Sequence, residues 1–378
     1  MRDLTGSGRP YPADRLHPRE GGPIGPASRR GALPRRRLLA LVPGGLAAAA
    51  LAACGGNGKA TPTPETQLPP VKKMTFMAGF KPQANLPFVG AYVAKEKGFF
   101  ADQRLDVDIR HAQSGEHLQL VLAGEVNVTT ANGSSVLKRN AQNLNIVSIA
   151  LIGQRSEQGF AVLEKSGIVS VKDWVGKTLG YKGSVPPEFL AVCAANGVDP
   201  SKVNQVSVGF DPRILAEGKV DILPVFFSNE PGILAAQGVK TRIFDPNDYG
   251  IESLGLTYIS TGDQIAKDPD GLQRFLKAAL RGIDYADKNR EEAVDIVMKY
   301  APDEDRAQQK FMMETELARA KTDLTAKNGI GWQTREQWQR NHDVLLQYKA
   351  IDKPVDVGLV YNDTFLKAIY KDGRLAWP

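Results

Sequence analysis

The sequence predicts an α/β protein with two lobes, and three observations support this fold class. Predicted strands alternate with predicted helices along the first part of the chain, a pattern typical of a largely parallel sheet. A second, shorter set of strands and helices follows, and the last third is mostly helical. About 308 residues, 71–378, follow the N-terminal leader and the tether described below, which is enough for two domains of about 150 residues each.

The first set of elements begins after residue 72. Apolar residues of 88–100 recur on one side of a predicted helix, and 146–152 is a continuous apolar run that suits a buried strand. The set is completed by predicted strands at 74–79, 105–109 and 126–130 and a predicted helix at 118–123.

The second set has predicted strands at 178–181, 206–209, 221–225 and 241–244, and predicted helices at 186–196, 214–217 and 231–237. Helical patterns then cover 271–287, 290–300, 304–320 and 337–348. We therefore expect lobe 1 to comprise 72–160 plus 256–378, and lobe 2 to comprise 161–255, with hinges near 151–162 and 255–260. Two connections create a cleft, and ligands of open α/β sheets bind at the carboxyl ends of strands.

Residues 1–53 are predicted to be a signal peptide. The apolar run Leu38–Ala53 directly follows three arginines, and it is shorter than the about 20 residues that span a bilayer. Its end, Leu51-Ala52-Ala53-Cys54, resembles the bacterial lipoprotein signal, which predicts that Cys54 is lipidated and becomes the new N-terminus. An ordinary signal with a chance Cys is the alternative. The segment Arg35-Arg36-Arg37-Leu38-Leu39 also resembles a twin-arginine export signal.

The leader also carries the net charge of the chain. The whole sequence has 48 Lys and Arg against 42 Asp and Glu, and removal of residues 1–53 leaves 39 of each. The mature chain is therefore formally neutral, which removes the charge argument for a nucleic-acid partner. Residues 54–71 are rich in Gly, Thr and Pro and are predicted to be a disordered tether.

The sequence lacks the patterns of common catalytic and metal sites. Cys54 and Cys193 are its only cysteines, and Cys193 lies in an apolar helical pattern, so we expect a buried thiol and no intramolecular disulfide. His111 and His117 have no acidic or Cys partners at metal-ligating spacing. Ser134 has no Gly-x-Ser-x-Gly setting. We expect no enzyme, no metal and no cofactor.

Several segments together resemble one protein family. Residues 80–88 form a loop with an aromatic residue, and the helix after it ends in Ala94-Lys95-Glu96-Lys97-Gly98-Phe99-Phe100. In these segments the chain resembles the periplasmic-binding-protein superfamily, in the branch of the thiamine-pyrimidine-precursor, riboflavin and alkylsulfonate binding proteins of ABC importers. The resemblance covers nearly all of 72–350, with further matches at 105–109, 122–126, 176–180, 218–221 and 229–232.

This resemblance implies a type II periplasmic-binding-protein fold with two hinge crossovers and a ligand cleft between lobes. It also implies a lipid-anchored protein on the extracytoplasmic face of the cell membrane, with ABC permease and ATPase subunits as partners. The implied ligand is a small aromatic heterocycle, riboflavin or a thiamine pyrimidine precursor. Phe80 and Lys81 stand where pyrimidine-precursor binders have a Trp, which leaves room for riboflavin. The alternatives are an alkylsulfonate- or nitrate-type anion binder, and an extracytoplasmic enzyme or sensor on the same fold.

Candidate ligand-binding residues of the first lobe follow its predicted strands. Phe80 offers a face for stacking, and Asn85 and Asn132 offer donors and acceptors for the polar edge of a ring. The alternative is that Phe80 caps the core and that the Asn side chains satisfy turns. The first-lobe candidates are Phe80, Lys81, Asn85, Asn132, Ser134 and Gln154.

Candidates of the second lobe lie near predicted helix starts. Glu230 is positioned to accept hydrogen bonds from ring N–H or amino groups, or else to complement the positive end of its helix. Tyr249 is either a second aromatic wall or a packed hinge residue. A strand–Gly–Ser–helix junction at Tyr181 and Ser184 exposes backbone N–H groups. The second-lobe candidates are Tyr181, Ser184, Phe227, Asn229, Glu230 and Tyr249.

Overall fold

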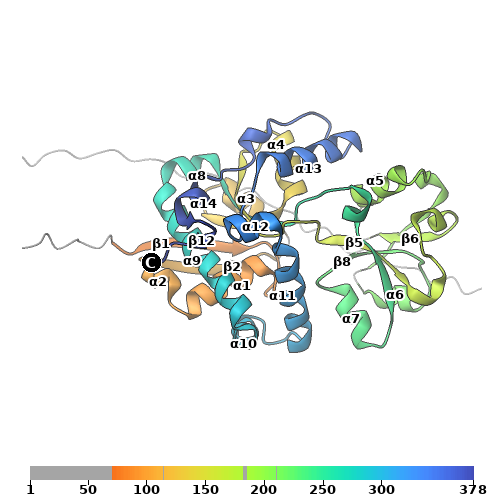
Figure 1. Cartoon of the computed structure of the whole chain (residues 1–378), viewed down its shortest axis with the longest axis horizontal. Helices are drawn as coiled ribbons and strands as arrows, with labels where there is room; N and C mark the ends of the chain where they lie inside the picture. Colours follow the sequence, from red (N-terminus) through yellow and green to blue (C-terminus); the bar gives the residue numbers. More distant parts are fainter. Residues whose placement is uncertain (1–69, 114, 182–184, 210) are drawn as a thin grey trace, which may run out of the picture. The chain divides into compact units, whose positions relative to one another are not determined.

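The computed structural model describes residues 70–113, 115–181, 185–209 and 211–378, which belong to one compact unit, Thr66–Pro378 (Figure 1). The predicted signal peptide, the predicted tether up to residue 69, Cys54 and Ser184 lie outside the described residues.

The first lobe is built on a five-stranded sheet. In spatial order its strands are β2 (Leu105–His111), β1 (Lys72–Ala78), β3 (Val128–Asn132), β10 (Leu256–Thr261) and β4 (Ile146–Leu151). β1 pairs in parallel with β2 and β3, whereas β10 runs antiparallel to β3 and β4. The prediction of a largely parallel sheet therefore missed β10, which enters this sheet on the chain's return from the second lobe.

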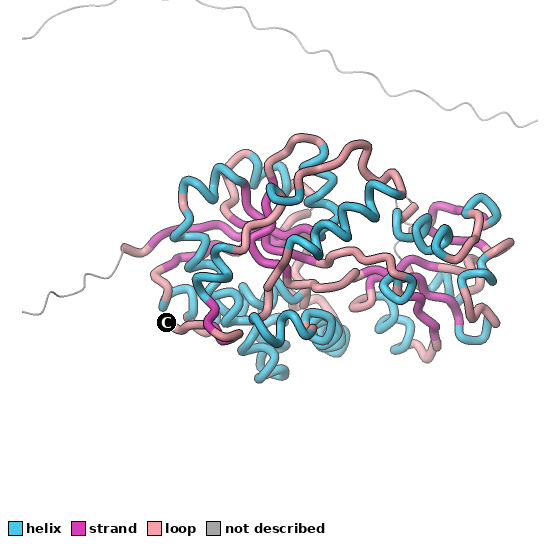
Figure 2. The backbone as a smooth tube through the Cα atoms, turned by 45° about the horizontal axis from the view of Figure 1, so that its top comes forward, coloured by secondary structure: helices cyan, strands magenta, loops and turns pink. Residues whose placement is uncertain are grey.

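Helices enclose this sheet (Figure 2). α1 (Leu86–Glu96) crosses α9 (Pro269–Lys288) closely, and a Cβ built on Gly282 would lie 2.1 Å from the carbonyl oxygen of Gly90. α1 ends before Gly98, whose φ of 79° turns the chain into α2 (Phe99–Asp102). The single helix predicted over 88–100 is therefore two helices separated by a left-handed glycine.

The second lobe holds an antiparallel sheet in the order β8 (Leu223–Phe226), β5 (Gln158–Leu163) and β9 (Thr241–Phe244). The chain enters this lobe through β5 and leaves it through β9, so the two paired strands run in opposite directions. Only β6 (Thr178–Tyr181) and β7 (Asn204–Ser207) form a parallel pair among the described strands of this lobe.

An aromatic cluster forms the core of the second lobe. Trp174 is fully buried and stacks on Phe189, with ring centroids 5.9 Å apart, while Phe160 and Phe244 meet it edge to face. Cys193 is buried in the same cluster, which confirms the expected buried thiol.

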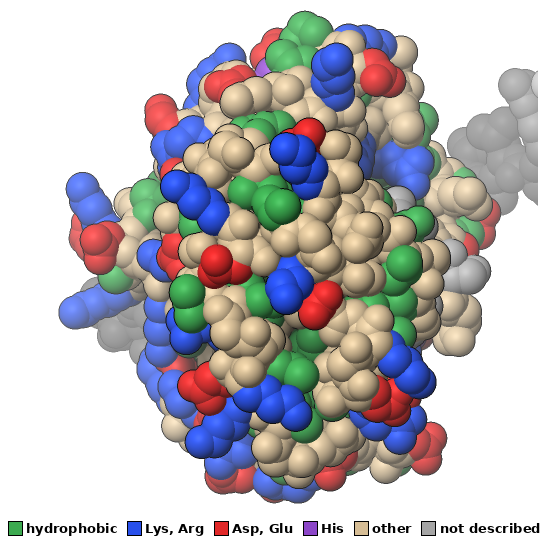
Figure 3. Space-filling model, turned by 90° about the vertical axis from the view of Figure 1, so that its right-hand side faces the viewer, with side chains coloured by type: hydrophobic (Ala, Val, Ile, Leu, Met, Phe, Trp, Pro, Cys, Tyr) green, Lys and Arg blue, Asp and Glu red, His purple; other side chains and the backbone are tan. Residues whose placement is uncertain are grey.

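The other described elements mostly cover the two lobes. Among the described residues, no helix has the length and apolar character needed to cross a membrane. Lys and Arg side chains are interspersed with Asp and Glu on the face seen in Figure 3. The other helices are α3 (His117–Leu122), α4 (Gly133–Ala141), α5 (Pro187–Ala195), α6 (Arg213–Ala216), α7 (Glu230–Ala236), α8 (Gly262–Lys267), α10 (Arg290–Tyr300), α11 (Arg306–Ala320), α12 (Asp323–Asn328), α13 (Arg335–Gln347) and α14 (Thr364–Ile369). Short 3₁₀ turns lie at Glu164–Ser166, Val171–Trp174, Pro200–Lys202, Pro246–Tyr249 and Val357–Leu359, and β11 (Tyr370–Lys371) pairs with β12 (Arg374–Leu375).

Candidate functional site

Two crossovers join the lobes, one between β4 and β5 and one between β9 and β10. They are hydrogen-bonded to each other, because Gly153 N–H donates to the Leu256 carbonyl (2.8 Å) and Gly255 N–H donates to the Gly153 carbonyl (2.9 Å). A Cβ on either glycine would lie 2.6 Å from Oε1 of Glu157. The crossovers approach this closely only because neither glycine has a side chain.

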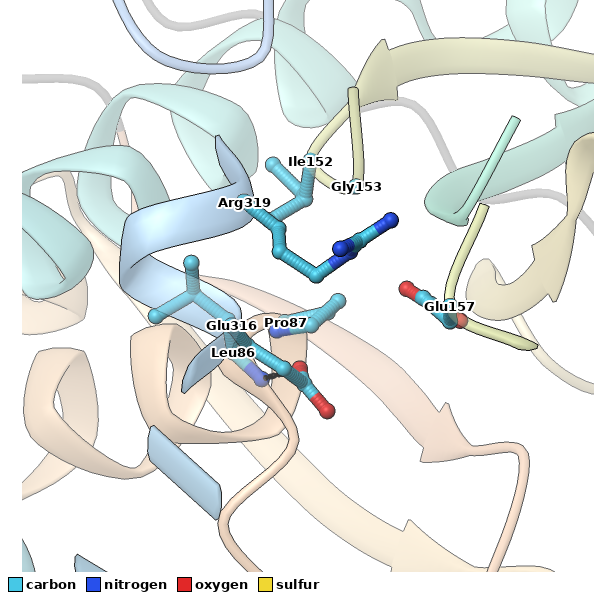
Figure 4. Close-up of a pocket in the computed structure, with 7 residues that line it drawn as sticks. All are labelled: Leu86, Pro87, Ile152, Gly153, Glu157, Glu316 and Arg319. Atoms are coloured by element: carbon cyan, nitrogen blue, oxygen red, sulfur yellow. Dashed lines mark hydrogen bonds between the residues drawn. The ribbon is translucent and has the colours of Figure 1, made fainter. Parts of the chain in front are cut away.

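A small cavity lies beside the crossovers (Figure 4). Its volume is about 10 Å³, which is room for about one water molecule. It combines apolar walls with three ionisable side chains, and its lining residues are Leu86, Pro87, Ile152, Gly153, Glu157, Glu316 and Arg319.

Glu316 of α11 connects loops of both lobes. Its carboxylate accepts hydrogen bonds from Asn85 Nδ2 (2.5 Å) and Leu86 N (2.6 Å) of the first lobe, and from Ser228 Oγ (3.1 Å) of the second. The side chain is 6% exposed. Burial raises the pKa of Glu316 to about 7, against the lowering effect of the hydrogen bonds that it accepts.

Glu157 lies at the end of the first crossover. Its Oε1 accepts a hydrogen bond from Leu256 N (2.6 Å), which ties this crossover to the start of β10. Burial raises the pKa of Glu157 to about 8, and the negative charge of Glu316 acts in the same direction. The Leu256 N–H and the positive charge of Arg319 oppose this rise.

Arg319 lies one helical turn beyond Glu316. Its Nε donates to the Ser156 carbonyl (2.9 Å), and its Nη2 pairs with Oδ2 of Asp245 (3.0 Å) in the second crossover. The guanidinium carbon lies 4.0 Å from the ring centroid of Phe227, within the range of cation–π interactions. The same ring lies against Gly159, where a built Cβ would be 2.6 Å from it.

Three predicted ligand residues gather at this cluster. Asn85 donates to Glu316, and Phe227 lies under Arg319. Asn229 accepts a hydrogen bond at its carbonyl from Gln308 Nε2 of α11 (3.1 Å).

Four other predicted residues make contacts within the protein. Asn132 caps α4 by accepting from Ser135 N (2.8 Å), and Ser134 Oγ lies 3.5 Å from Asn341 Nδ2. Gln154 is 5% exposed and donates to the carbonyls of Leu151 and Trp332 at 2.6 and 2.8 Å. Glu230 is 3% exposed and accepts from Phe226 N (2.8 Å).

The structure does not bring the remaining described candidates into the cavity wall. Phe80 is 56% exposed, and Lys81 forms an ion pair with Glu304. Tyr249 packs against the aromatic core of the second lobe, and Tyr181 ends β6.

Glu157, Glu316 and Arg319 are not among the ligand-binding residues predicted from the sequence. A signal for Glu316 exists in the sequence of α11, where the buried positions are Gln309, Met312, Met313, Glu316, Leu317 and Ala320. Polar residues that interrupt a buried apolar stripe mark positions with specific partners. Gln309 has such a partner too, because it accepts from Ala84 N (2.8 Å) in the loop after β1.

The chain is similar to two binding proteins and to a synthase. The riboflavin-binding protein RibY of Chloroflexus aurantiacus is 27% identical over 81% of this chain and 89% of its own length. A formylaminopyrimidine-binding protein of Halalkalibacterium halodurans is 27% identical over 70% and 82%. A 4-amino-5-hydroxymethyl-2-methylpyrimidine phosphate synthase of Candida albicans is 25% identical over 56% and 67%.

The fold has a match among solved structures. The periplasmic sulfonate-binding protein SsuA of Methylobacillus flagellatus superimposes with a TM-score of 0.60, at 16% identity, over 79% of this chain and 94% of its own. This likeness confirms the predicted type II periplasmic-binding-protein fold. The family model described as NMT1/THI5 like matches residues 85–293, more than half of the sequence. The chain belongs to the NMT1/THI5-like family.

Proposed function

We propose that this protein is the substrate-binding component of an ABC importer and captures a small aromatic heterocycle. The observation that carries the proposal is the cluster of Glu157, Glu316, Arg319 and Phe227 beside the two crossovers. An aromatic ring and buried acids are the groups that recognise a flat ring with a polar edge. The ligands in the names of two relatives, riboflavin and formylaminopyrimidine, are both of this kind.

Closure of the two lobes is the proposed binding motion. In this conformation the cavity holds about 10 Å³, so a ring enters only when the lobes separate. Hinge motion at two crossovers is an established way to open and close a cleft. The contacts of Glu316 with both lobes would then form on closure.

An anion binder is the less favoured alternative. The guanidinium of Arg319 already pairs with Asp245, and two further acids, Glu157 and Glu316, line the same cavity. At neutral pH the raised pKa values of Glu157 and Glu316 leave these acids partly protonated, but Asp245 already neutralises Arg319, so the guanidinium is not a free positive charge for a sulfonate.

The proposed location is the extracytoplasmic face of the cell membrane, with a permease and an ATPase as partners. Lipidation of Cys54 and the tether 54–71 would keep the binding unit beside the permease. Mass spectrometry of the membrane-extracted protein should find an acylated N-terminal Cys54, and Cys54→Ala should release the protein from the membrane. A protein that stays membrane-bound and unacylated would contradict this part of the proposal.

Thermal unfolding tests the ligand. Riboflavin or formylaminopyrimidine at 100 times its Kd should stabilise the protein by about 2.7 kcal/mol. A yellow chromophore in the absorbance spectrum of the natively extracted protein would favour riboflavin. Phe227→Ala should weaken binding, whereas Phe226→Ala, which removes the neighbouring 42% exposed ring, should leave it unchanged.

The enzyme alternative is tested in the same samples. Bound ligand is recovered after prolonged incubation and analysed by mass spectrometry. We expect the unchanged compound. Recovery of a product formed in proportion to protein and time would replace the transport function with catalysis.

A further inference from the structure

One face of α11 contacts the second lobe, and we call this contact the clasp. Gln308 donates to the carbonyl of Asn229 (3.1 Å), and Glu316 accepts from Ser228 (3.1 Å). The ring of Phe311 lies so close to Gly232 that a built Cβ would be 2.6 Å from it. These residues recur on one side of the helix, so α11 forms a continuous contact with the segment that follows β8.

Arg319 is the last residue of α11 in the clasp, and it contributes a planar guanidinium group. Its guanidinium stacks over Phe227 at 4.0 Å and donates from Nε and Nη2 to Ser156 and Asp245. The Arg319 and Asp245 side chains are 18% and 20% exposed. The guanidinium is thus a flat, mostly buried group with its face on an aromatic ring and its N–H edge on oxygen acceptors.

A flat heterocycle with an N–H donor edge would make the same set of contacts. Phe227 offers the ring face on which the guanidinium now lies, and the ring also packs against Gly159, where a built Cβ would be 2.6 Å from it. The Ser156 carbonyl and the Asp245 carboxylate supply acceptors along one edge, and Glu157 lines the same cavity. In this conformation the Arg319 side chain fills that position, and only about 10 Å³ remains beside it.

We propose that Arg319 is an internal stand-in for the ligand, and that the ligand is a planar molecule with an N–H donor edge that displaces the guanidinium from Phe227, Ser156 and Asp245. This inference rests on the proposed binding function and names the chemistry of its ligand. Arg319 holds the lobes together when no ligand is bound, and it competes with the ligand for the same acceptors. It is a positioning residue that tunes affinity, and its loss favours binding.

Small-angle X-ray scattering of the purified full chain without added ligand tests the clasp. Arg319→Ala should increase the radius of gyration, because the lobes lose the Phe227 and Asp245 contacts. Arg319→Lys keeps the charge but loses the planar fork, so it should give an intermediate value. The control is Arg306→Ala, which removes an exposed arginine of the same helix that pairs with Glu291 and Asp295. Equal radii for wild type and Arg319→Ala would overturn the clasp.

Calorimetric titration with riboflavin, formylaminopyrimidine and ethanesulfonate tests the competition. Arg319→Ala should bind the planar ligand several-fold more tightly than wild type, because a larger fraction of the protein is binding-competent. Weaker binding by Arg319→Ala would show a direct ligand contact and overturn the inference while leaving the proposed function intact. If neither protein binds any planar compound, the proposed function fails, and scattering still decides whether Arg319 closes the lobes.

Discussion

Replacing Glu316 with Gln should change how the free energy of unfolding depends on pH. Burial raises the pKa of this carboxyl from 4.5 to about 7 in the folded protein. Between these values the folded state keeps a proton that the unfolded chain has released. A shift of this size corresponds to about 3 kcal/mol, at about 1.4 kcal/mol for each pKa unit.

The sign follows from the direction of the shift. The contribution of Glu316 to stability is fully present below pH 4.5 and is lost as the pH rises through about 7. Glu157 acts in the same direction, because its pKa is also raised. His111 and His117 act in the opposite direction, because burial lowers their pKa values and unfolding then takes up protons. The difference between wild type and variant removes the contributions of His111 and His117 and reports Glu316 together with its effect on the pKa of Glu157.

Urea unfolding between about pH 5 and pH 8.5 measures this difference. At the acidic end Glu316→Gln should be less stable by about 1–3 kcal/mol, because the amide nitrogen cannot accept a hydrogen bond as the second oxygen of the protonated carboxyl group does. The deficit should shrink or invert at the alkaline end. Glu314→Gln, on the same helix and 37% exposed, is the control and should keep the wild-type slope. Parallel curves for wild type and Glu316→Gln would refute the role of burial.

Three further predictions concern the hinge and the second-lobe core. Gly255→Ala should destabilise the protein by a few kcal/mol, since its Cβ would lie 2.9 Å from the Arg155 carbonyl oxygen and 2.6 Å from Glu157 Oε1, which is held by Leu256 N. Chemical denaturation should show no such loss for Gly209→Ala, where a Cβ meets nothing within 4 Å. Trp174→Phe should lower the free energy of unfolding by less than the about 3–5 kcal/mol typical of Trp→Ala, because Trp174 Nε1 is buried without a hydrogen-bond partner. A larger loss of stability in thermal unfolding would point to an unrecognised partner. The Cys193 thiol should react with a thiol reagent only after unfolding, because burial raises its pKa to about 12, and rapid labelling of the native protein would contradict this.

Much of the fold could be predicted because its signals are local. The apolar run at 146–152 is the buried strand β4, and the helices predicted at 271–287 and 290–300 correspond to α9 and α10. The relative direction of the paired strands was harder to predict. Helix–strand alternation favours parallel pairing, but β10 and the β8-β5-β9 sheet are antiparallel because the chain leaves the first lobe and later returns to it.

In the candidate site, some of the residues could be predicted from the sequence, but their contacts could not. Asn85, Phe227 and Asn229 could be selected because each follows a predicted strand or precedes a predicted helix. The contacts of these residues could not be predicted. Asn85 binds Glu316 and Phe227 packs against Arg319, and both of these partners lie in α11, a helix late in the chain.

The sequence by itself determined most of the order of strands and helices, the family resemblance and the apolar setting of Cys193, and it predicts a neutral mature chain. These properties depend on residues that are close together in the sequence, because periodicity and composition are local features. Only the tertiary structure decided that Glu157, Glu316 and Arg319 share one cavity. The raised pKa values of Glu157 and Glu316 arise from burial, and the pairing of Arg319 with Asp245 arises from the approach of distant segments; neither is encoded in local spacing.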